Sequence, residues 1–228
     1  MDIGKSFTYV LDDPQWIMKV LIGGVLFLIP IVNLAVFGYA LNTSKNVADG
    51  NPTPMPEWSD FGNHFMRGLY AFIGVLVYFL PAILLYCCLF VIIFALSLAA
   101  GGTTSRSNDA LGGVVSIVSL CFYCVIGLYS LVASISIPAA LTRFAMSANQ
   151  LSIFWDFRGN FGFIRQNLSN YVIALLVGWV ASFVAGFGII LCIVGVVFTW
   201  FWAYMVTAYL YGQLWRASQG TMPAPAMA

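Results

Sequence analysis

Residues 68–105 read GLYAFIGVLVYFLPAILLYCCLFVIIFALSLAAGGTTS and contain no Lys, Arg, Asp or Glu. A helix needs roughly 20 apolar residues to cross a hydrocarbon core that is about 30 Å thick. Because backbone groups in lipid must bond within their own segment, a run of this kind must be helical. It also lacks the apolar–polar alternation of barrel strands. The run therefore predicts an all-α integral membrane protein.

The rest of the chain has the same character. Its 228 residues are 61% hydrophobic and 7% charged, whereas average soluble domains carry about 25% charged residues. Further charge-free runs are 20–44, 110–142 and 166–215. The last run is too long for one helix, and glycines in GFGIILCIVG (186–195) weaken helix propensity. We expect a break there, between spans at about 168–187 and 191–215.

The first run allows two interpretations. LIGGVLFLIPIVNLAVFGYALN (21–42) fits one ordinary span, which gives five crossings in all. Alternatively, Pro30 ends one helix, because proline cannot donate a backbone hydrogen bond and disfavours the α conformation before it. The result is a short hairpin with arms at about 16–29 and 31–46. Its first arm, about 21 Å long at 1.5 Å per residue, would be re-entrant or would thin the bilayer.

The positive charges favour the hairpin, since cytoplasmic loops are enriched in Lys and Arg. Five crossings divide the nine basic residues six to three, and the hairpin moves Lys5 and Lys19 to the majority side. Only Arg106 is then left outside. We expect a helical bundle of six segments in three hairpins, in the inner (cytoplasmic) membrane, with both termini cytoplasmic. The six residues on the majority side in both interpretations are Lys45, Arg67, Arg143, Arg158, Arg165 and Arg216.

A polar, aromatic segment precedes the second and third hairpins. WSDFGN (58–63) is echoed by WDFRGN (155–160), and a fainter version with Trp16 precedes the first. Trp favours the headgroup level, Arg reaches phosphates, and Asp or Asn caps helices that begin in water. We therefore expect interfacial amphipathic segments at these places. The residues assigned to interfacial or partner contact are Glu57, Trp58, Asp60, Asn63, His64, Arg67, Trp155, Asp156, Asn160 and Arg165.

Residues 50–65, GNPTPMPEWSDFGNHF, hold the only histidine of this apolar chain. We expect a loop that runs into an amphipathic helix in the cytoplasmic interface, with His64 solvated. The alternative is a docking surface for a soluble partner or a lipid headgroup.

The chain is expected to form a single membrane domain over residues 1–228. Its parts are an interfacial segment with the short hairpin (1–48), two further segments each with a hairpin (49–142 and 143–215), and a C-terminal tail (216–228).

The stretch GYALNTSKNVADGNPTPMPEW (38–58) carries a family resemblance. A Gly-Tyr pair closes the first run, and a basic residue, a glycine and Pro-Glu-Trp follow, although Met55 stands where Leu is expected. Here the chain resembles the uncharacterised prokaryotic membrane family called domain of unknown function 4013. The resemblance implies a prokaryotic integral membrane protein and brings no activity, cofactor or catalytic residue. The matching residues are Gly38, Tyr39, Lys45, Gly50, Pro56, Glu57 and Trp58, with Gly212 and Gln213 later in the chain.

Two polar or small-residue patterns lie inside the apolar runs, where charges are absent. One helical face either packs on another helix or lines a wet crevice, and its polar members are Ser116, Ser119, Tyr123, Ser130 and Ser134. The other has small residues at every fourth position, which is typical of close helix packing. Its members are Ala174, Gly178, Ser182 and Gly186.

Nothing in the sequence supports catalysis or a bound cofactor. His64 lies outside the apolar runs, and Cys121 and Cys124 form a C-x-x-C without a histidine, which is typical of packing residues. A net charge of +1 offers no basis for nucleic-acid binding. We expect no enzyme activity, no cofactor and no metal.

The leading hypothesis is a non-catalytic scaffold or accessory subunit of a membrane complex. Its partners would be the lipid bilayer and other membrane subunits or a second copy. The alternative is a transporter or channel for a small neutral or lipid-like molecule, and a third is a lipid- or stress-responsive modulator. The surroundings of the serine face on 110–142 discriminate between the first two.

Overall fold

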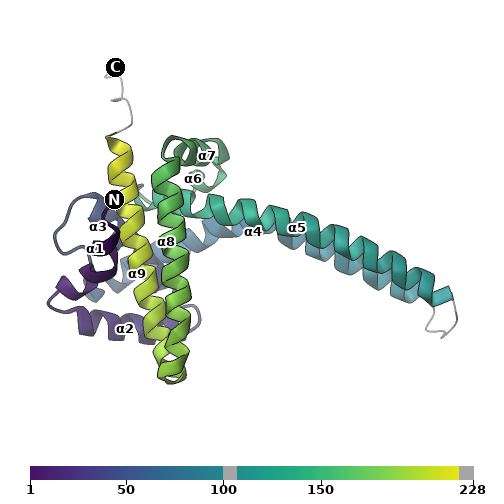
Figure 1. Cartoon of the computed structure of the whole chain (residues 1–228), viewed down its shortest axis with the longest axis horizontal. Coiled ribbons are helices and arrows are strands. Elements are labelled where there is room, and N and C mark those ends of the chain that lie inside the picture. The colour runs from purple at the N-terminus through teal and green to yellow at the C-terminus, as the bar shows by residue number, and fades with distance from the viewer. Residues whose placement is uncertain (100–106, 221–228) are drawn as a thin grey trace, which may run out of the picture. The chain divides into compact units, whose positions relative to one another are not determined.

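The computed structural model describes residues 1–99 and 107–220 (Figure 1). Within these ranges the chain is all-α, as predicted, and no β-strand occurs. The helices in chain order are α1 (Ile3–Thr8), η1 (Tyr9–Asp12), α2 (Trp16–Leu28), α3 (Leu34–Ala48), η2 (Trp58–Asp60), α4 (Phe61–Ala99), α5 (Ser107–Ala145), α6 (Ser152–Trp155), α7 (Phe157–Gln166), α8 (Leu168–Gly186), η3 (Phe187–Leu191) and α9 (Cys192–Gln219).

Both helix breaks predicted from local sequence are present. Helix α2 ends at Leu28, just before Pro30, and α3 begins at Leu34, four residues after the proline. Ile31 in this turn has φ of 70°, in the left-handed region that branched residues rarely adopt. The later break lies at η3, between α8 and α9. By contrast, α4 continues as one helix through Pro81.

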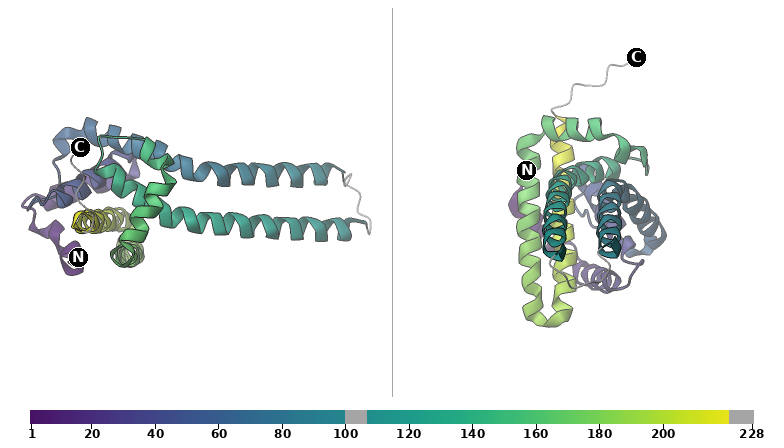
Figure 2. Two further views of the ribbon diagram at one scale, coloured as in Figure 1. Left: turned by 90° about the horizontal axis from the view of Figure 1, so that it is seen from above. Right: turned by 90° about the vertical axis from the view of Figure 1, so that its right-hand side faces the viewer.

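The described chain divides into two compact units, Met1–Gly74 with Ala139–Ala228 and Val75–Pro138. In the first unit α9 is the central helix, and α1, α2, α3 and α8 pack against it (Figures 1 and 2). The arms of the short N-terminal hairpin therefore rest chiefly on α9 rather than on each other. The side chains of α9 that are fully buried there are Phe201, Met205, Val206, Leu210, Leu214 and Ser218.

Helices α3 and α4 cross with their backbones in close contact. A Cβ added at Gly38 would overlap the backbone carbonyl of His64, and one added at Gly68 would overlap that of Leu34. Both helices therefore present bare backbone to each other, which only glycine allows. This crossing aligns the polar side chains on either side of it.

The second unit consists of parts of α4 and α5, which lie side by side (Figure 2). Tyr129 on α5 donates a hydrogen bond to the carbonyl of Tyr78 on α4, at 2.7 Å. Large apolar side chains point outward along both helices, as Phe90 at 70% and Leu128 at 68% exposure illustrate. Such a surface suits lipid and not water.

Length and apolar composition make three helices able to cross a membrane, among the residues the structure describes. They are Trp58–Leu98, Gly112–Ala145 and Leu168–Ile190. These helices agree with the membrane class predicted from the sequence. They leave the number of crossings and the side of each terminus as predictions.

Candidate functional site

A buried ion cluster ties the loop after α3 to the N-terminal helices. Lys19 Nζ lies 2.8 Å from Asp13 Oδ2 and 2.8 Å from Glu57 Oε1, and it donates to the carbonyl of Met55 at 3.1 Å. The side chains of Lys19 and Asp13 are only 5% exposed. A charge buried this deeply is tolerated only when paired and hydrogen-bonded. The cluster therefore holds residues 55–57 onto α2.

Trp58 belongs to the core of the first unit. Its ring stacks on Tyr39, with ring centroids 4.2 Å apart and planes at 17°, and its Nε1 donates to the carbonyl of Lys19 at 3.1 Å. The hydroxyl of Tyr39 donates to the carbonyl of Pro56 at 2.9 Å. The rings of Trp58 and Tyr39 thus pack against the protein's own interior.

A polar relay crosses the α3–α4 contact beside this stack. His64 Nε2 lies 2.9 Å from the carbonyl of Glu57, which can only accept, so Nε2 carries the proton. His64 Nδ1 then accepts from Asn42 Nδ2 at 2.6 Å, which leaves Asn42 Oδ1 to accept from the guanidinium of Arg67. Arg67 also donates to the carbonyl of Ala145. These bonds select one histidine tautomer and one amide orientation.

One expectation about this segment is wrong. His64 is 2% exposed and not solvated, because it lies under the loop and against α3. The loop runs through η2 into α4, which begins at Phe61 and continues into the apolar run. Arg67 is 7% exposed, and its Nε has no hydrogen-bond partner among the described residues. Of the predicted contact residues, Asp60 and Asn63 are exposed and bond to each other at 3.0 Å.

Residues 155–160, which repeat this sequence pattern, are held in place by Arg143 near the end of α5. Asp156 caps α7 by accepting from the Gly159 N–H at 2.9 Å, and Arg143 donates to it at 2.8 Å. Those two contacts, the Gly159 N–H first, hold the pKa of Asp156 below its usual range. Arg143 also donates to Asn160 Oδ1 at 2.5 Å, and Asn160 Nδ2 donates to the carbonyl of Ile153 at 2.9 Å.

The two tryptophans of the repeated pattern thus have opposite surroundings. Trp58 is half-buried in an aromatic stack, whereas Trp155 is 64% exposed. Arg67 is buried, whereas Arg165 is exposed. The repeated sequence pattern located both segments. It did not predict this difference in burial, because burial depends on the helices that pack around each segment.

Half of the small face expected on α8 lies in the helix contact. Ala174 and Gly178 are buried, but Ser182 is half-buried and Gly186 is exposed, with open space beside it. A Cβ at Gly178 would meet Thr207 only at ordinary contact distance, 3.5 Å. Four-residue steps drift around a helix of 3.6 residues per turn, so they leave the interface. The buried stripe alternates three and four, through Tyr171, Ala174, Gly178, Ala181 and Ala185.

Most of the serine face of α5 is exposed within the second unit. Ser116, Ser130 and Ser134 are exposed, Ser119 is half-buried, and Tyr123 is 54% exposed. Ser116 and Ser134 donate to carbonyls of their own helix, those of Gly112 and Leu131, both at 2.8 Å. The face therefore lines no cavity described in this chain.

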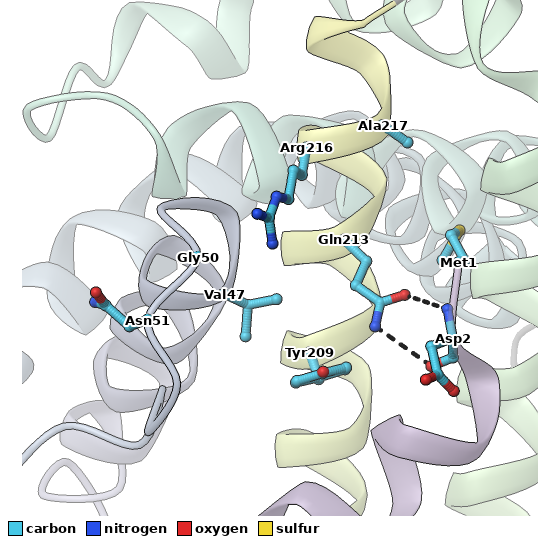
Figure 3. Close-up of a pocket in the computed structure, with 9 residues that line it drawn as sticks. All are labelled: Met1, Asp2, Val47, Gly50, Asn51, Tyr209, Gln213, Arg216 and Ala217. Atoms are coloured by element: carbon cyan, nitrogen blue, oxygen red, sulfur yellow. Dashed lines mark hydrogen bonds between the residues drawn. The ribbon is translucent and has the colours of Figure 1, made fainter.

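A cavity of about 360 Å³ opens where the ends of α3 and α9 meet the start of α1 (Figure 3). Asp2 N–H donates to Gln213 Oε1 at 2.7 Å, and Gln213 Nε2 donates back to the Asp2 carbonyl at 3.3 Å. The Arg216 guanidinium reaches over Gly50, which has φ of +82°. The sequence signalled this cavity only through Gly50 and Gln213, two positions of the family resemblance. Its lining residues are Met1, Asp2, Val47, Gly50, Asn51, Tyr209, Gln213, Arg216 and Ala217.

The described residues contain no group of three His, Cys, Asp or Glu side chains that could hold a metal ion. His64 and Arg67 are occupied in the relay, and the Asp2 carboxylate caps α1 by accepting from the Lys5 N–H at 2.9 Å. The hydrogen bonds of these polar groups hold helices and the loop together.

Comparison with known proteins supports the resemblance noted in the sequence. A family model described as "Protein of unknown function (DUF4013)" matches residues 22–194, which is more than half of the chain. No curated protein and no solved structure matches at a significant level. The matched region holds the buried relay, the echoed segment and both long helices of the second unit. The chain belongs to the DUF4013 family of proteins of unknown function.

Proposed function

We propose that this protein is a non-catalytic integral membrane protein that acts as a scaffold or accessory subunit of a membrane complex. Its partners are lipid and either other membrane subunits or a second copy. The observation that carries the proposal is the exposed serine face of α5, formed by Ser116, Ser119, Tyr123, Ser130 and Ser134.

Hydroxyl groups on a helix otherwise surrounded by lipid are suited to contact another helix. Small polar residues allow close approach, and their hydrogen bonds across helices contribute about 1 kcal/mol each. The same face favours a scaffold over the transporter alternative, because it borders no cavity described within one chain. A second helix brought from outside would cover it.

We further propose six membrane segments with both termini in the cytoplasm. The short helices α2 and α3 would form a re-entrant pair, since 13 and 15 residues span only about 20 and 23 Å. The buried Lys19 and Asn42 on these helices fit a pair enclosed by protein and not by lipid. The pairs α4 with α5 and α8 with α9 would cross. Eight of the nine basic residues would then lie inside.

Photo-crosslinking from α5 tests the scaffold proposal. In full-length protein whose native cysteines are replaced by serine, Ser130→Cys carries a benzophenone label in intact membranes. Val132→Cys is the matched control, because it is exposed at 60% on the opposite side of the same helix.

We expect one protein adduct of discrete mass from Ser130→Cys and only lipid adducts from Val132→Cys. Lipid adducts alone from both positions would contradict the proposal. Equal protein adducts from both would also contradict it, because the serine face would then have no special role.

A further inference from the structure

We infer that the outer face of α6 and α7 is a docking surface for anionic phospholipid headgroups. The surface consists of Trp155, Phe157, Arg158, Phe161, Arg165 and Leu168. It goes beyond the proposed scaffold role, since it concerns the lipid that the protein selects and holds whether or not a second subunit is present.

The apolar half of this surface is large and outward. Trp155 is 64%, Phe161 65% and Leu168 56% exposed, and Phe157 is 53% exposed. At 100° per residue, Phe157 and Phe161 lie about 40° apart on α7, and Leu168 begins the next helix. The opposite face of α7 is buried through Asn160, Phe163 and Ile164. The helix is thus amphipathic, and its outward face carries aromatic rings.

The charged half of the surface is positive and has no acid to pair with. Arg158 and Arg165 are exposed and lie about two turns apart at one edge of the aromatic stripe. Neither makes an ion pair within the described part of the chain, and the nearby carboxylate of Asp156 is already taken by Arg143. Guanidinium groups bind phosphate through paired hydrogen bonds, so two free ones beside exposed rings match an anionic headgroup layer.

The position of α7 along the chain determines its depth in the membrane. Asn167 ends α7 at its C-cap, and Leu168 begins α8, which is apolar and long enough to cross a membrane. A helix that ends where a crossing helix begins lies at headgroup level, where Trp and Arg are favoured. The contacts of Arg143 with Asp156 and Asn160 fix the rotation of α7 about its own axis, so the same face stays outward.

A spin label on α7 tests this assignment in the full-length protein. Phe161→Cys, made with the native cysteines replaced by serine, carries a nitroxide in proteoliposomes of phosphatidylcholine with or without phosphatidylglycerol. Collisions with oxygen report lipid, and collisions with a water-soluble nickel chelate report water. Gln166→Cys is the matched control, because it is exposed on another side of α7.

We expect oxygen collisions to exceed nickel collisions at position 161 and the reverse at position 166. Phosphatidylglycerol should raise the oxygen-to-nickel ratio at 161 severalfold, and Arg158→Gln with Arg165→Gln should abolish that rise. An unchanged melting temperature of the double variant shows that its fold is intact.

Equal nickel access at both positions in both lipid mixtures would overturn the inference and leave the face open to a water-soluble protein. An oxygen-to-nickel ratio at position 161 that is the same with and without phosphatidylglycerol would overturn the role of the two arginines. The burial of this face in lipid would then depend on its apolar side chains only.

Discussion

Glycine determines where helix backbones touch in this protein, and sequence spacing did not reveal which glycines do so. The spacing of small residues pointed to α8, but the bare contact lies between Gly38 and Gly68 on α3 and α4. A glycine's role depends on what lies across from it, which is a tertiary fact. Likewise, nothing local distinguishes His64 in a buried relay from a solvated histidine.

Gly38→Ala should destabilise the protein, because its Cβ would overlap the backbone carbonyl of His64, which cannot move aside as a side chain can. We expect a loss of about 1–3 kcal/mol in the free energy of unfolding, as overpacking typically costs. Gly62→Ala is the control, since its Cβ would meet nothing within 4 Å. Melting in detergent measures both, and equal melting temperatures would show that the α3–α4 contact is looser than described.

Asp156 should make stability depend on acid pH. Its pKa in the folded chain is lowered, by the Gly159 N–H and then by Arg143. A lowered pKa means that the carboxylate stabilises the fold above its unfolded pKa, about 4, and that this contribution is lost as pH falls through the folded pKa.

Melting temperatures of the wild type and Asp156→Asn, compared from neutral to acid pH, test this directly. The gap between the two proteins should be widest at neutral pH and should close as Asp156 becomes protonated. A gap that stays constant across the acid range would show that the cap does not depend on the charge.

At the scale of elements, features set by local backbone chemistry were predictable. Pro30 ends α2 and the glycines near residue 188 interrupt the last run, because both act on the residues beside them. The central position of α9 was not predictable, since Phe201 and Leu210 look like any apolar residues until four other helices surround them. The cavity beside Gln213 was not predicted either, because three segments that are far apart in the sequence form it.

The contact of α8 with α9 gives a prediction at this scale. Ala181 is fully buried and packs in a cluster with Val206 and Leu210, so Ala181→Leu should cost about 1–3 kcal/mol. Val180→Leu is the control, because Val180 is 56% exposed on the neighbouring position. Thermal melting in detergent compares them. Equal melting of the two variants would mean that the three-four stripe is not the packing face.

At the scale of the whole chain, composition alone indicated the class. Charge-free runs required helices in a membrane, and the described residues contain three helices able to cross one. Composition does not identify partners, because lipid and another apolar helix both favour apolar side chains. The outward serines of α5 are the feature on which the scaffold proposal rests, since small side chains allow a second helix to approach closely.

Extraction of a tagged full-length copy with a polymer that retains native lipid, followed by mass determination, tests the scaffold proposal most directly. We predict a particle that contains the chain with a second protein, or a second copy, in fixed stoichiometry, and a Ser116→Leu, Ser130→Leu variant that releases it. If the wild type instead gives a particle that holds one copy of the chain and lipid alone, the scaffold role is contradicted and the transporter hypothesis is favoured.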